Sequence, residues 1–328
     1  MMSCDGIFST FRIRDIELAN RIVVPPMVQV RPITSPEGIA WYRRLAAGGA
    51  GLVIVEATGV PRFRNELTPK TLRALVDAIH VGGAKVAIQL FPVRIGQKTE
   101  PDDLSLEQIE AMIDHYGKAA TICRKAGFDG VEPHGAHGYL LNRFFMPDRN
   151  CRTDAFGGSL ENRVRLAVRI VRRIREAVGE NLLILFRHTP TGDAYTMEDS
   201  LSFAGQLVRA GIDVLDISPA RRAAVADLAA PFKARLSVPV IAVNGMEDPE
   251  EAERAVREGR CDLVAVGRQM IADAQWPRKV RDGKREEIRR CTKCDKGCFG
   301  NLRKHKPVEC VLWPEHELTG YMPQGGDS

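Results

Sequence analysis

His134, His137 and Tyr139 form a compact set of side chains that can donate and accept protons. They follow Gly130–Glu132, which is typical of the end of a β-strand, where polar side chains favour a functional site. If this loop turns helically, residues three apart share a face, with Cβ atoms about 5–6 Å apart. We then expect both imidazoles to bind one oxygen atom and Tyr139 to transfer a proton. The spacing also fits two solvated histidines, or half of a metal site that would need further ligands.

A second group with its own chemistry is a run of cysteines near the C-terminus. Cys291, Cys294, Cys298 and Cys310 have the spacing C-x₂-C-x₃-C-x₁₁-C. Four thiolates can hold zinc or an iron–sulfur cluster. A zinc ribbon usually has two separate C-x₂-C pairs, whereas three of these cysteines are packed together, which favours a four-iron cluster over zinc. The scattered cysteines are interpreted as small buried or unreactive thiols; they are Cys4, Cys123, Cys151 and Cys261.

The scaffold that must position these groups is indicated by short apolar runs that alternate with helical patterns. Strands buried on both faces are continuous apolar runs of this kind. We expect eight strands, at Arg21–Pro26, Gly51–Ala57, Lys85–Leu90, Gly130–Glu132, Leu182–Arg187, Val214–Ile217, Pro239–Val243 and Leu263–Val266. Eight such units predict an α/β fold, the closed (β/α)₈ TIM barrel. The rival, a doubly wound open sheet, lacks the G-x-G-x-x-G motif that follows its first strand.

The remaining elements surround this barrel. Phe8–Asn20 alternates as a hairpin with its turn at Arg14-Asp15. Ser105 and Gln108 form a capping box that opens a long helix. We expect helices at Pro36–Ala47, Pro69–His80, Ser105–Ala126, Ser159–Val178, Met197–Ala210, Ala223–Ala234 and Asp248–Glu258. The chain then divides into a barrel at residues 1–285 and a cysteine-rich extension at residues 286–328, packed on the barrel.

Functional residues of such barrels lie at the C-terminal ends of the strands, and phosphate binds at the loops after strands 7 and 8. Asn244-Gly245 and Gly267-Arg268 follow those two strands. The glycines allow close approach of the backbone, and Arg268 adds positive charge. Glycine also serves ordinary tight turns, but the joint position of the two pairs favours a phosphate-bearing ligand.

Length and composition restrict the class of protein. The chain has 328 residues and is 44% hydrophobic, which suits one barrel with a small extension. Its formal charge of +5 is spread along the chain, so we expect no nucleic-acid partner. No apolar run reaches about 18 residues, so we expect no membrane span. The N-terminus lacks the apolar core of a signal peptide, and we predict a cytoplasmic protein with reduced thiols.

The segment HGAHGYLLNRFFMPDRNCRTDAFGGSLENR resembles the signature of the Old Yellow Enzyme family of FMN-dependent oxidoreductases. The likeness runs from Pro25–Met27 through GLVIVEAT and AIQL to VNG and DLVAVGR, and so covers nearly the whole chain. The cysteine spacing is similar to the 4Fe-4S motif of the branch that includes dienoyl-CoA reductase, enoate reductase and trimethylamine dehydrogenase. Those relatives continue into an FAD- and nucleotide-binding region. We expect that region to be absent here, because the chain stops soon after Cys310.

The resemblance implies a role for each matching residue. His134 and His137 would hydrogen-bond the carbonyl oxygen of the substrate, and Tyr139 would protonate its α-carbon after FMN delivers hydride to the β-carbon. Arg187 would stabilise negative charge at the N1–O2 edge of the flavin. The other residues expected to bind FMN are Pro25, Met27, Ala57 and Gln89 around the ring, and Asn244, Gly245, Gly267 and Arg268 at the phosphate. Conjugate hydride addition builds an enolate, and one fixed donor at its oxygen is worth about 2.7–4 kcal/mol.

Four departures from the family pattern set this chain apart. Val28 stands where the family often has a Thr or Cys that bonds flavin O4, so we expect a lowered flavin potential. The stretch Gln89–Arg94 lacks a usual histidine, and Phe91–Leu104 is short. We infer an open mouth, suited to a bulky substrate or a docking partner. Arg143 replaces a common Gln and has no assigned role.

The leading hypothesis is an ene-reductase that reduces a C=C bond conjugated to a carbonyl, with the 4Fe-4S cluster relaying electrons singly into FMN. The donor would be a separate electron-transfer flavoprotein or NAD(P)H reductase. The first alternative is an amine dehydrogenase or N-demethylase; amine dehydrogenases replace the first histidine with Tyr, so His134 favours the ene-reductase. An RNA-modifying flavoprotein would need an RNA-binding domain, which we do not expect here, and the His-x-x-His signature also argues against it. A non-catalytic electron-transfer subunit would not need the intact set of His134, His137 and Tyr139. The substrate is expected to be an enone, enoyl compound or amine.

Overall fold

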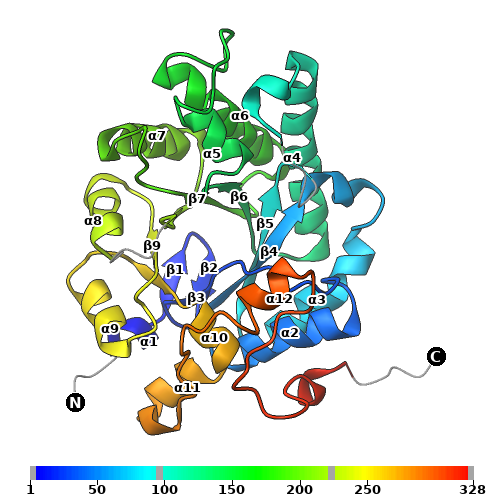
Figure 1. The fold of residues 1–328 in the computed structure, drawn as a ribbon, viewed down its shortest axis with the longest axis vertical. Coiled ribbons are helices and arrows are strands. Elements are labelled where there is room, and N and C mark those ends of the chain that lie inside the picture. The colour runs from blue at the N-terminus through cyan, green and yellow to red at the C-terminus, as the bar shows by residue number, and fades with distance from the viewer. Residues whose placement is uncertain (1–4, 94–98, 221–225, 324–328) are drawn as a thin grey trace.

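Eight parallel strands close into a barrel at the centre of the molecule (Figure 1). The computed structural model describes residues 5–93, 99–220 and 226–323. Around the barrel the strand order is β10-β3-β4-β5-β6-β7-β8-β9. The strands are β3 (Ile22–Val24), β4 (Leu52–Gly59), β5 (Lys85–Phe91), β6 (Gly130–Gly135), β7 (Leu183–His188), β8 (Val214–Ile217), β9 (Val240–Val243) and β10 (Leu263–Ala265). The predicted (β/α)₈ TIM barrel is therefore confirmed.

Helices surround the strands, with bounds close to the predicted ones. Ser105 caps α4 by accepting a hydrogen bond from the Gln108 N–H, and the Gln108 side chain accepts one from the Ser105 N–H. The large helices are α2 (Pro36–Ala47), α3 (Pro69–Val81), α4 (Leu106–Ala126), α6 (Leu160–Val178), α7 (Met197–Ala210), α8 (Ala226–Arg235) and α9 (Pro249–Arg257). The predicted start of α8 at residues 223–225 lies outside the described residues. Short helices that were not predicted include α5 (Leu140–Phe145) and α10 (Arg268–Ala272).

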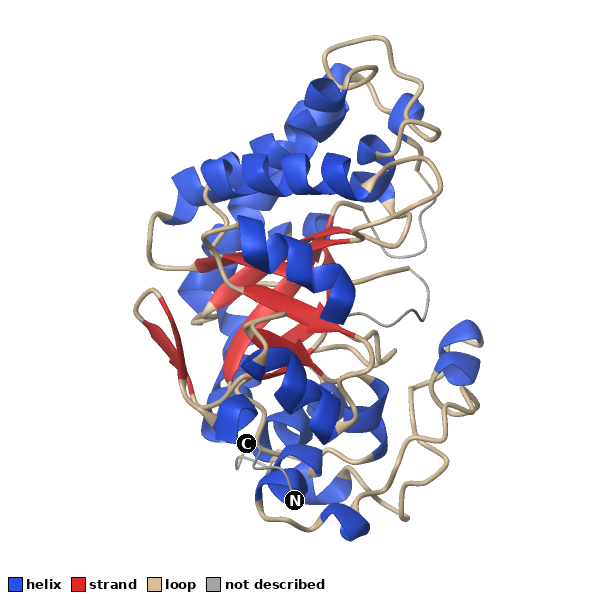
Figure 2. Ribbon diagram, turned by 90° about the vertical axis from the view of Figure 1, so that its left-hand side faces the viewer, coloured by secondary structure: helices blue, strands red, loops and turns tan. Residues whose placement is uncertain are grey.

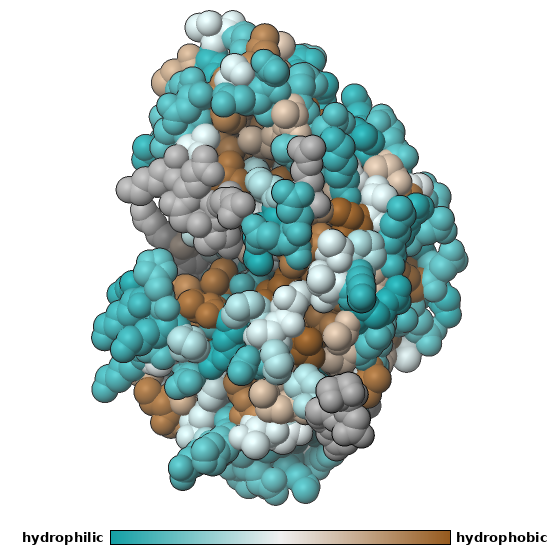
Figure 3. Space-filling view, turned by 90° about the vertical axis from the view of Figure 1, so that its right-hand side faces the viewer, coloured by the Kyte–Doolittle hydropathy of each residue, from teal (hydrophilic) through white to brown (hydrophobic). Residues whose placement is uncertain are grey.

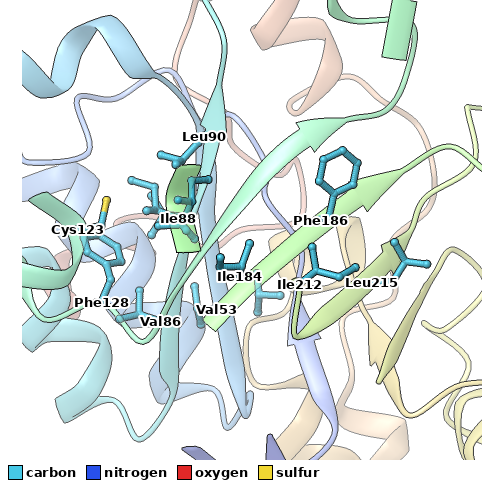
Figure 4. Close-up of a cluster of buried hydrophobic side chains, with 14 of the residues drawn as sticks. Val53, Val86, Ile88, Leu90, Cys123, Phe128, Ile184, Phe186, Ile212 and Leu215 are labelled. Atoms are coloured by element: carbon cyan, nitrogen blue, oxygen red, sulfur yellow. The ribbon is translucent and has the colours of Figure 1, made fainter. Parts of the chain in front are cut away.

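Each strand separates two apolar layers because successive side chains point to opposite faces. Val53 of β4 faces the helices, together with Val86, Ile184 and Phe128 (Figure 4). The neighbouring residues Leu52 and Ile54 point into the barrel instead. Two of the scattered cysteines, Cys123 and Cys261, are buried as expected, whereas Cys151 is exposed and Cys4 lies outside the described residues.

The N-terminal hairpin closes one end of the barrel (Figure 2). Strand β1 (Phe11–Ile13) pairs antiparallel with β2 (Ile16–Leu18) across the predicted turn at Arg14-Asp15. Ile13 and Leu18 join the interior cluster that contains Leu52, the first residue of β4. The hairpin therefore covers the N-terminal end of the strands, and the opposite end is the mouth.

The C-terminal extension is tied to the barrel through a buried guanidinium. Arg44 of α2 is fully buried, with its guanidinium carbon 5.4 Å from the ring centre of Trp41 and 4.6 Å from that of Trp313. Its Nη1 lies 3.2 Å from Glu317, which also pairs with Arg289 at 2.8 Å. The extension thus packs against α2, while the proposed boundary at residue 286 stays a prediction. It contains α12 (Phe299–Arg303) and follows α11 (Trp276–Arg281).

Figure 3 shows one face on which hydrophilic side chains dominate and apolar ones appear between them. In the part of the chain that the structure describes, no helix is both long and apolar enough to cross a bilayer.

Candidate active site

Strand β6 is longer than its sequence suggests, and this places His134 on the strand. Pairing with β7 continues through His134 opposite Arg187 and Gly135 opposite His188. His137 follows in a left-handed conformation, with φ of 60°. The expectation of a helical turn is therefore wrong, because strand pairing around the barrel extends three residues further. The two imidazoles still meet, with ring centres 5.3 Å apart and planes inclined by 63°.

Tyr139 lies at the outer edge of this pair. Its ring centre is 5.3 Å from that of His134 and 5.2 Å from that of Phe91. His134 is 4% exposed, whereas Tyr139 is 49% exposed. The phenol is therefore much more open than His134 to a molecule entering the mouth.

His137 is held by side chains that were not assigned from the sequence. Its Nε2 lies 2.9 Å from the hydroxyl oxygen of Ser218, and its backbone N–H donates to the hydroxyl of Thr189 at 2.9 Å. That hydroxyl in turn donates to the Ser218 carbonyl at 2.9 Å. Arg187 Nη2 donates to the Ser218 hydroxyl at 2.8 Å. Ser218 therefore connects the second imidazole to the guanidinium.

Arg143, which the sequence left without a role, braces the loop between His137 and Tyr139. Its Nε donates to the Gly138 carbonyl at 2.6 Å, and its Nη1 lies 2.5 Å from Glu100. The Gly138 N–H donates to the Asn142 side chain at 2.8 Å. The first turn of α5 thus fixes the loop that presents both functional side chains. Part of the short segment Phe91–Leu104, at residues 94–98, lies outside the described residues.

A buried layer of polar side chains lies inside the barrel beneath the mouth. On β5, β7 and β8, each polar residue comes two positions after an apolar residue of the interior cluster, namely Ala87, Leu185 and Val214. Because side chains alternate along a strand, the polar side chain points into the same interior. The layer consists of Gln89, Glu132, Arg187 and Asp216. Gln89 Nε2 donates to Glu132 Oε1 at 2.7 Å, and Arg187 Nε lies 3.6 Å from Asp216 Oδ2. The apolar core is therefore replaced by hydrogen-bonding groups at the level of His134.

The surroundings of both imidazoles favour their neutral form. Burial lowers the pKa of His134 well below its ordinary value, and the charges of His137 and Arg187 lower it further. The surrounding protein also removes water from the His137 ring and so lowers its pKa, and the charge of Arg187 lowers it further. The residue nevertheless keeps an exposed side at the mouth. Among the described residues, His134 Nδ1 has no hydrogen-bond partner. A buried polar atom of this kind is costly unless a ligand or water satisfies it.

Three of the predicted cofactor residues, on the side of the mouth opposite His134, lie close together. A Cβ atom added to Gly267 would lie 3.6 Å from Pro25 Cγ and 3.7 Å from Met27 Sδ. Asn244 and Gly245 both have left-handed backbones, with φ of 80° and 74°. Asn and Gly are the residues that tolerate this conformation, so the turn after β9 needs them.

Two further predicted residues have unexpected surroundings. Ala57 is half-buried at a β-bulge of β4, where the pairing with β5 shifts between Val55 and Thr58. Bulges often occur next to active sites, where they redirect a side chain. Arg268 points to the C-terminal extension, and its Nη1 lies 2.9 Å from Asp295. Its side chain therefore has a partner other than a phosphate.

The four cysteines of the C-terminal motif line one pocket, with Arg268 and Ile271 on the barrel side. Burial raises the pKa of Cys310, and each of the other three cysteines raises it further, so the four thiols lie near one another. A hydrogen bond from the Lys296 N–H lowers the pKa of Cys294. Across residues 5–93, 99–220 and 226–323, no three His, Cys, Asp or Glu side chains are arranged to bind one metal ion.

The pocket is tied to the mouth by backbone contacts. The Cys291 N–H donates to Gln269 Oε1 at 2.9 Å, and Gln269 Nε2 donates to the Arg289 carbonyl at 3.0 Å. The Val308 N–H donates to the Gln29 carbonyl at 3.0 Å. Gln29 lies two residues after Met27, so the cysteine segment contacts both the loop after β3 and the start of α10.

Comparison with known proteins places this geometry in a family. The model of the NADH:flavin oxidoreductase / NADH oxidase family matches residues 94–287. The chain belongs to this family. It is FMN-dependent, and its members are oxidoreductases of the Old Yellow Enzyme type, so the resemblance found in the sequence is confirmed.

Two relatives and one solved structure illustrate the match. An NADH oxidase of Thermoanaerobacter brockii is 34% identical over 94% of this chain and 56% of that protein. An NADPH dehydrogenase of Halalkalibacterium halodurans is 32% identical over 84% of this chain and 93% of that protein. A 2-naphthoyl-CoA reductase in complex with 2-naphthoyl-CoA has a TM-score of 0.87 and 25% identity, over 98% of this chain and 58% of that chain. The chain thus spans little more than half the length of the first and third of these proteins.

Proposed function

We propose that this FMN-dependent oxidoreductase is an ene-reductase, which reduces a C=C bond conjugated to a carbonyl. The observation that carries the proposal is the pair of neutral imidazoles of His134 and His137, 5.3 Å apart at the mouth of the barrel beside Tyr139. Conjugate reduction turns the carbonyl oxygen into an enolate oxygen, which needs fixed hydrogen-bond donors.

The two histidines fit the role of enolate donors. Each neutral imidazole has one N–H donor, and Ser218 and strand β6 hold the rings in place. The unpartnered Nδ1 of His134 supports a ligand atom at this position. Because the donors are held before substrate binds, no reorganisation is needed as negative charge develops.

Tyr139 fits the role of proton donor to the α-carbon. Its ring packs against His134 and Phe91, which fixes its direction, while the phenol is exposed to the mouth. A substrate whose oxygen contacts the histidines would lie beside this hydroxyl. The proton transfer then needs no movement of the chain.

The residues present fit an FMN at the mouth. When bound, FMN supplies the hydride that the β-carbon accepts. Gln89 and Arg187 form a polar floor on which a flavin edge can bind, and Ala57 at the bulge leaves space for the ring. Pro25, Met27 and Gly267 are neighbours, and Asn244-Gly245 lies at the next strand end. The pairing of Arg268 with Asp295 leaves it the least supported of the proposed phosphate ligands.

We also propose that Cys291, Cys294, Cys298 and Cys310 hold a 4Fe-4S cluster, which supplies one-electron transfer when bound. The convergence of all four thiols on one pocket supports a metal centre. The close sequence spacing of Cys291, Cys294 and Cys298 favours a cluster over zinc, because a zinc ribbon usually has two separate C-x₂-C pairs. The electron donor, proposed to be an electron-transfer flavoprotein or an NAD(P)H reductase, would reach FMN through this side of the barrel.

Anaerobic purification followed by a visible spectrum and iron and zinc assays tests the cofactors. The reduced protein is then mixed with simple enones, and the oxidised protein with N-methyl amines. The proposal predicts bound flavin, iron without zinc, and reoxidation by an enone. Flavin reduction by amines without reoxidation by any enone would favour the amine dehydrogenase instead. A protein without flavin would contradict the whole proposal.

A further inference from the structure

Three charged side chains are buried together in the polar layer, on three consecutive strands. Glu132 of β6, Arg187 of β7 and Asp216 of β8 are at most 5% exposed. Arg187 pairs with Asp216 in the strand register and lies between the two carboxyl groups in strand order. One guanidinium therefore faces two carboxyl groups in a site closed to bulk water.

The hydrogen bonding of these three side chains is incomplete unless one of the carboxyl groups is protonated. Gln89 Nε2 donates to Glu132 Oε1, which leaves Glu132 Oε2 without a donor among the described residues. Both carboxylate oxygens of Asp216 also lack a hydrogen-bond donor there. Yet the two carboxyl groups flank Arg187 inside the barrel and are close enough for each to influence the pKa of the other. Two carboxylates are acceptors only, so they can bond only when one of them is protonated.

We propose that Glu132 and Asp216 share one proton, which Glu132 Oε2 donates to Asp216, and that this proton fixes the net charge beside Arg187. The carboxylate left on Asp216 then balances the guanidinium. The hydrogen bonds run in one chain from Gln89 through Glu132 to Asp216. Glu132 and Asp216 are thus positioning residues, which act on the site through Arg187.

The electrostatics agree with this placement of the proton. Burial, followed by the charge of Asp216, raises the pKa of Glu132 well above its ordinary value. Burial also raises the pKa of Asp216, while Arg187 opposes that rise. Like charges in a shared buried site cannot both ionise easily, so one carboxyl group keeps its proton. Asp216, which has the guanidinium beside it, is the one that ionises first.

Few other groups face the pair. Gln89 contacts it from β5, and His134 lies beyond Arg187 with a lowered pKa that keeps it neutral. Strands β3, β9 and β10 carry apolar side chains. The acid on β4, Glu56, bonds instead to the Gln29 N–H and the Tyr42 hydroxyl. Besides burial, the titration of the pair is therefore governed by Arg187 and by the two carboxyl groups themselves.

The consequence for the flavin rests on the proposed function, which places Arg187 at the flavin edge. With one shared proton, the two carboxyl groups and Arg187 together carry no net charge, so they do not oppose the addition of electrons to the flavin. Loss of the proton at high pH leaves a net negative charge and lowers the flavin potential. Glu132→Gln keeps the neutral side chain at every pH, and Glu132→Gln with Asp216→Asn leaves the positive charge unbalanced.

Infrared spectra and flavin potentials of the holoenzyme across a pH range test the proposal. The wild type is expected to show the carbonyl band of a protonated acid near neutral pH, and this band is lost in Glu132→Gln. Glu56, whose pKa burial raises to about 7, gives a separate band that both proteins retain. The flavin potential of the wild type should fall more steeply at high pH than that of Glu132→Gln, and the double variant should have the highest potential. Glu253→Gln, which replaces a buried acid that binds the Gly6 and Ile7 N–H groups, serves as the matched control.

Two outcomes would overturn the proposal. Identical carbonyl bands in the wild type and Glu132→Gln would exclude a proton on the pair. A shared proton together with equal potentials in all proteins would show that the pair does not set the charge at the flavin. Neither result depends on turnover of an enone, so each is distinct from failure of the proposed function. If Glu132→Gln fails to fold, Glu132→Gln with Asp216→Asn provides the same comparison of carbonyl bands, because neither of its amide side chains can carry the shared proton.

Discussion

The mouth of the barrel and the cysteine segment are built in different ways. At the mouth, His134, Arg187 and Asp216 lie on neighbouring strands and are buried in the fold itself, and Arg187 is hydrogen-bonded to Ser218. In the cysteine segment, Cys294 is exposed, and the other three thiols are half-buried on loops. A site on paired strands is organised by the fold, whereas a site on loops is organised by what it binds.

The two regions nevertheless contact each other. The loop after β3 and the start of α10 belong to the mouth, and both form hydrogen bonds to the cysteine segment. A change in the cysteine segment can therefore reach the mouth through Gln29 and Gln269, while the strands stay intact.

The largest expected effect is loss of the metal centre. Cys298→Ser or Cys310→Ser should abolish iron binding, because a four-thiolate site loses one ligand. Hydrogen exchange should then quicken in residues 286–323 and remain slow in the strands. Cys151→Ser, which changes an exposed cysteine outside the motif, is the control and should retain full iron content. Equal iron content in all three variants would show that these cysteines are not ligands.

The second prediction concerns the attachment of the segment to the barrel. Glu317→Gln removes the partner of the buried Arg44 and should lower the unfolding free energy by about 3–5 kcal/mol. Arg44→Met removes the buried charge itself, and Glu317 keeps Arg289, so this change should cost only about 1–2 kcal/mol. Urea unfolding measures both. A larger loss for Arg44→Met than for Glu317→Gln would contradict the account.

The third prediction concerns the mouth alone. Tyr139→Phe should slow turnover of an enone by about 100-fold, because the proton donor is lost. Iron content and stability should not change, since the phenol is exposed and the ring packing is kept. Steady-state rates at several enone concentrations measure the effect. Full activity of the variant would assign the proton transfer to another group.

The fourth prediction uses the buried histidines as reporters of the barrel. Burial lowers the pKa of His134 well below its ordinary value and that of His188 to about 3. These groups are neutral when folded but bind protons in the unfolded chain below about pH 6.5. Their stabilising contribution is complete above that pH and is lost as the pH falls toward 3. Each histidine adds a slope of about 1.4 kcal/mol per pH unit.

Urea unfolding between neutral pH and about pH 5 measures this slope. His188→Phe should reduce it by one proton, because the slope counts the protons taken up on unfolding. An unchanged slope would mean that His188 is protonated in the folded protein.

Much of the fold could be predicted because its signals are local. The helices α2 and α7 and strand β8 have the predicted bounds, since apolar periodicity and caps mark them directly. The end of β6 was missed because Pro133 and Gly135 resemble a loop, and only the pairing with β7 extends the strand. Which side of a strand faces the barrel interior also depends on the closed sheet.

The candidate site was predicted in the same uneven way. His134, His137 and Tyr139 are near in sequence and could be singled out from it, the four cysteines have a recognisable spacing, and the roles assigned to both sets stay predictions. Ser218 and Thr189 support His137 from neighbouring strand ends, and their contacts depend on the barrel. An available signal for the carboxyl pair was an acid inside an apolar run, as in Val214–Ile217.

The central claim is that His134 and His137 stabilise an enolate oxygen. Anaerobic stopped-flow mixing of the reduced holoenzyme with an enone measures this step directly. His134→Ala and His137→Ala should each slow reoxidation by about 10²–10³-fold with flavin still bound, whereas His80→Ala, at the opposite end of the barrel, should not. Reoxidation at the wild-type rate in both of the first two variants, at equal flavin content, would contradict the claim.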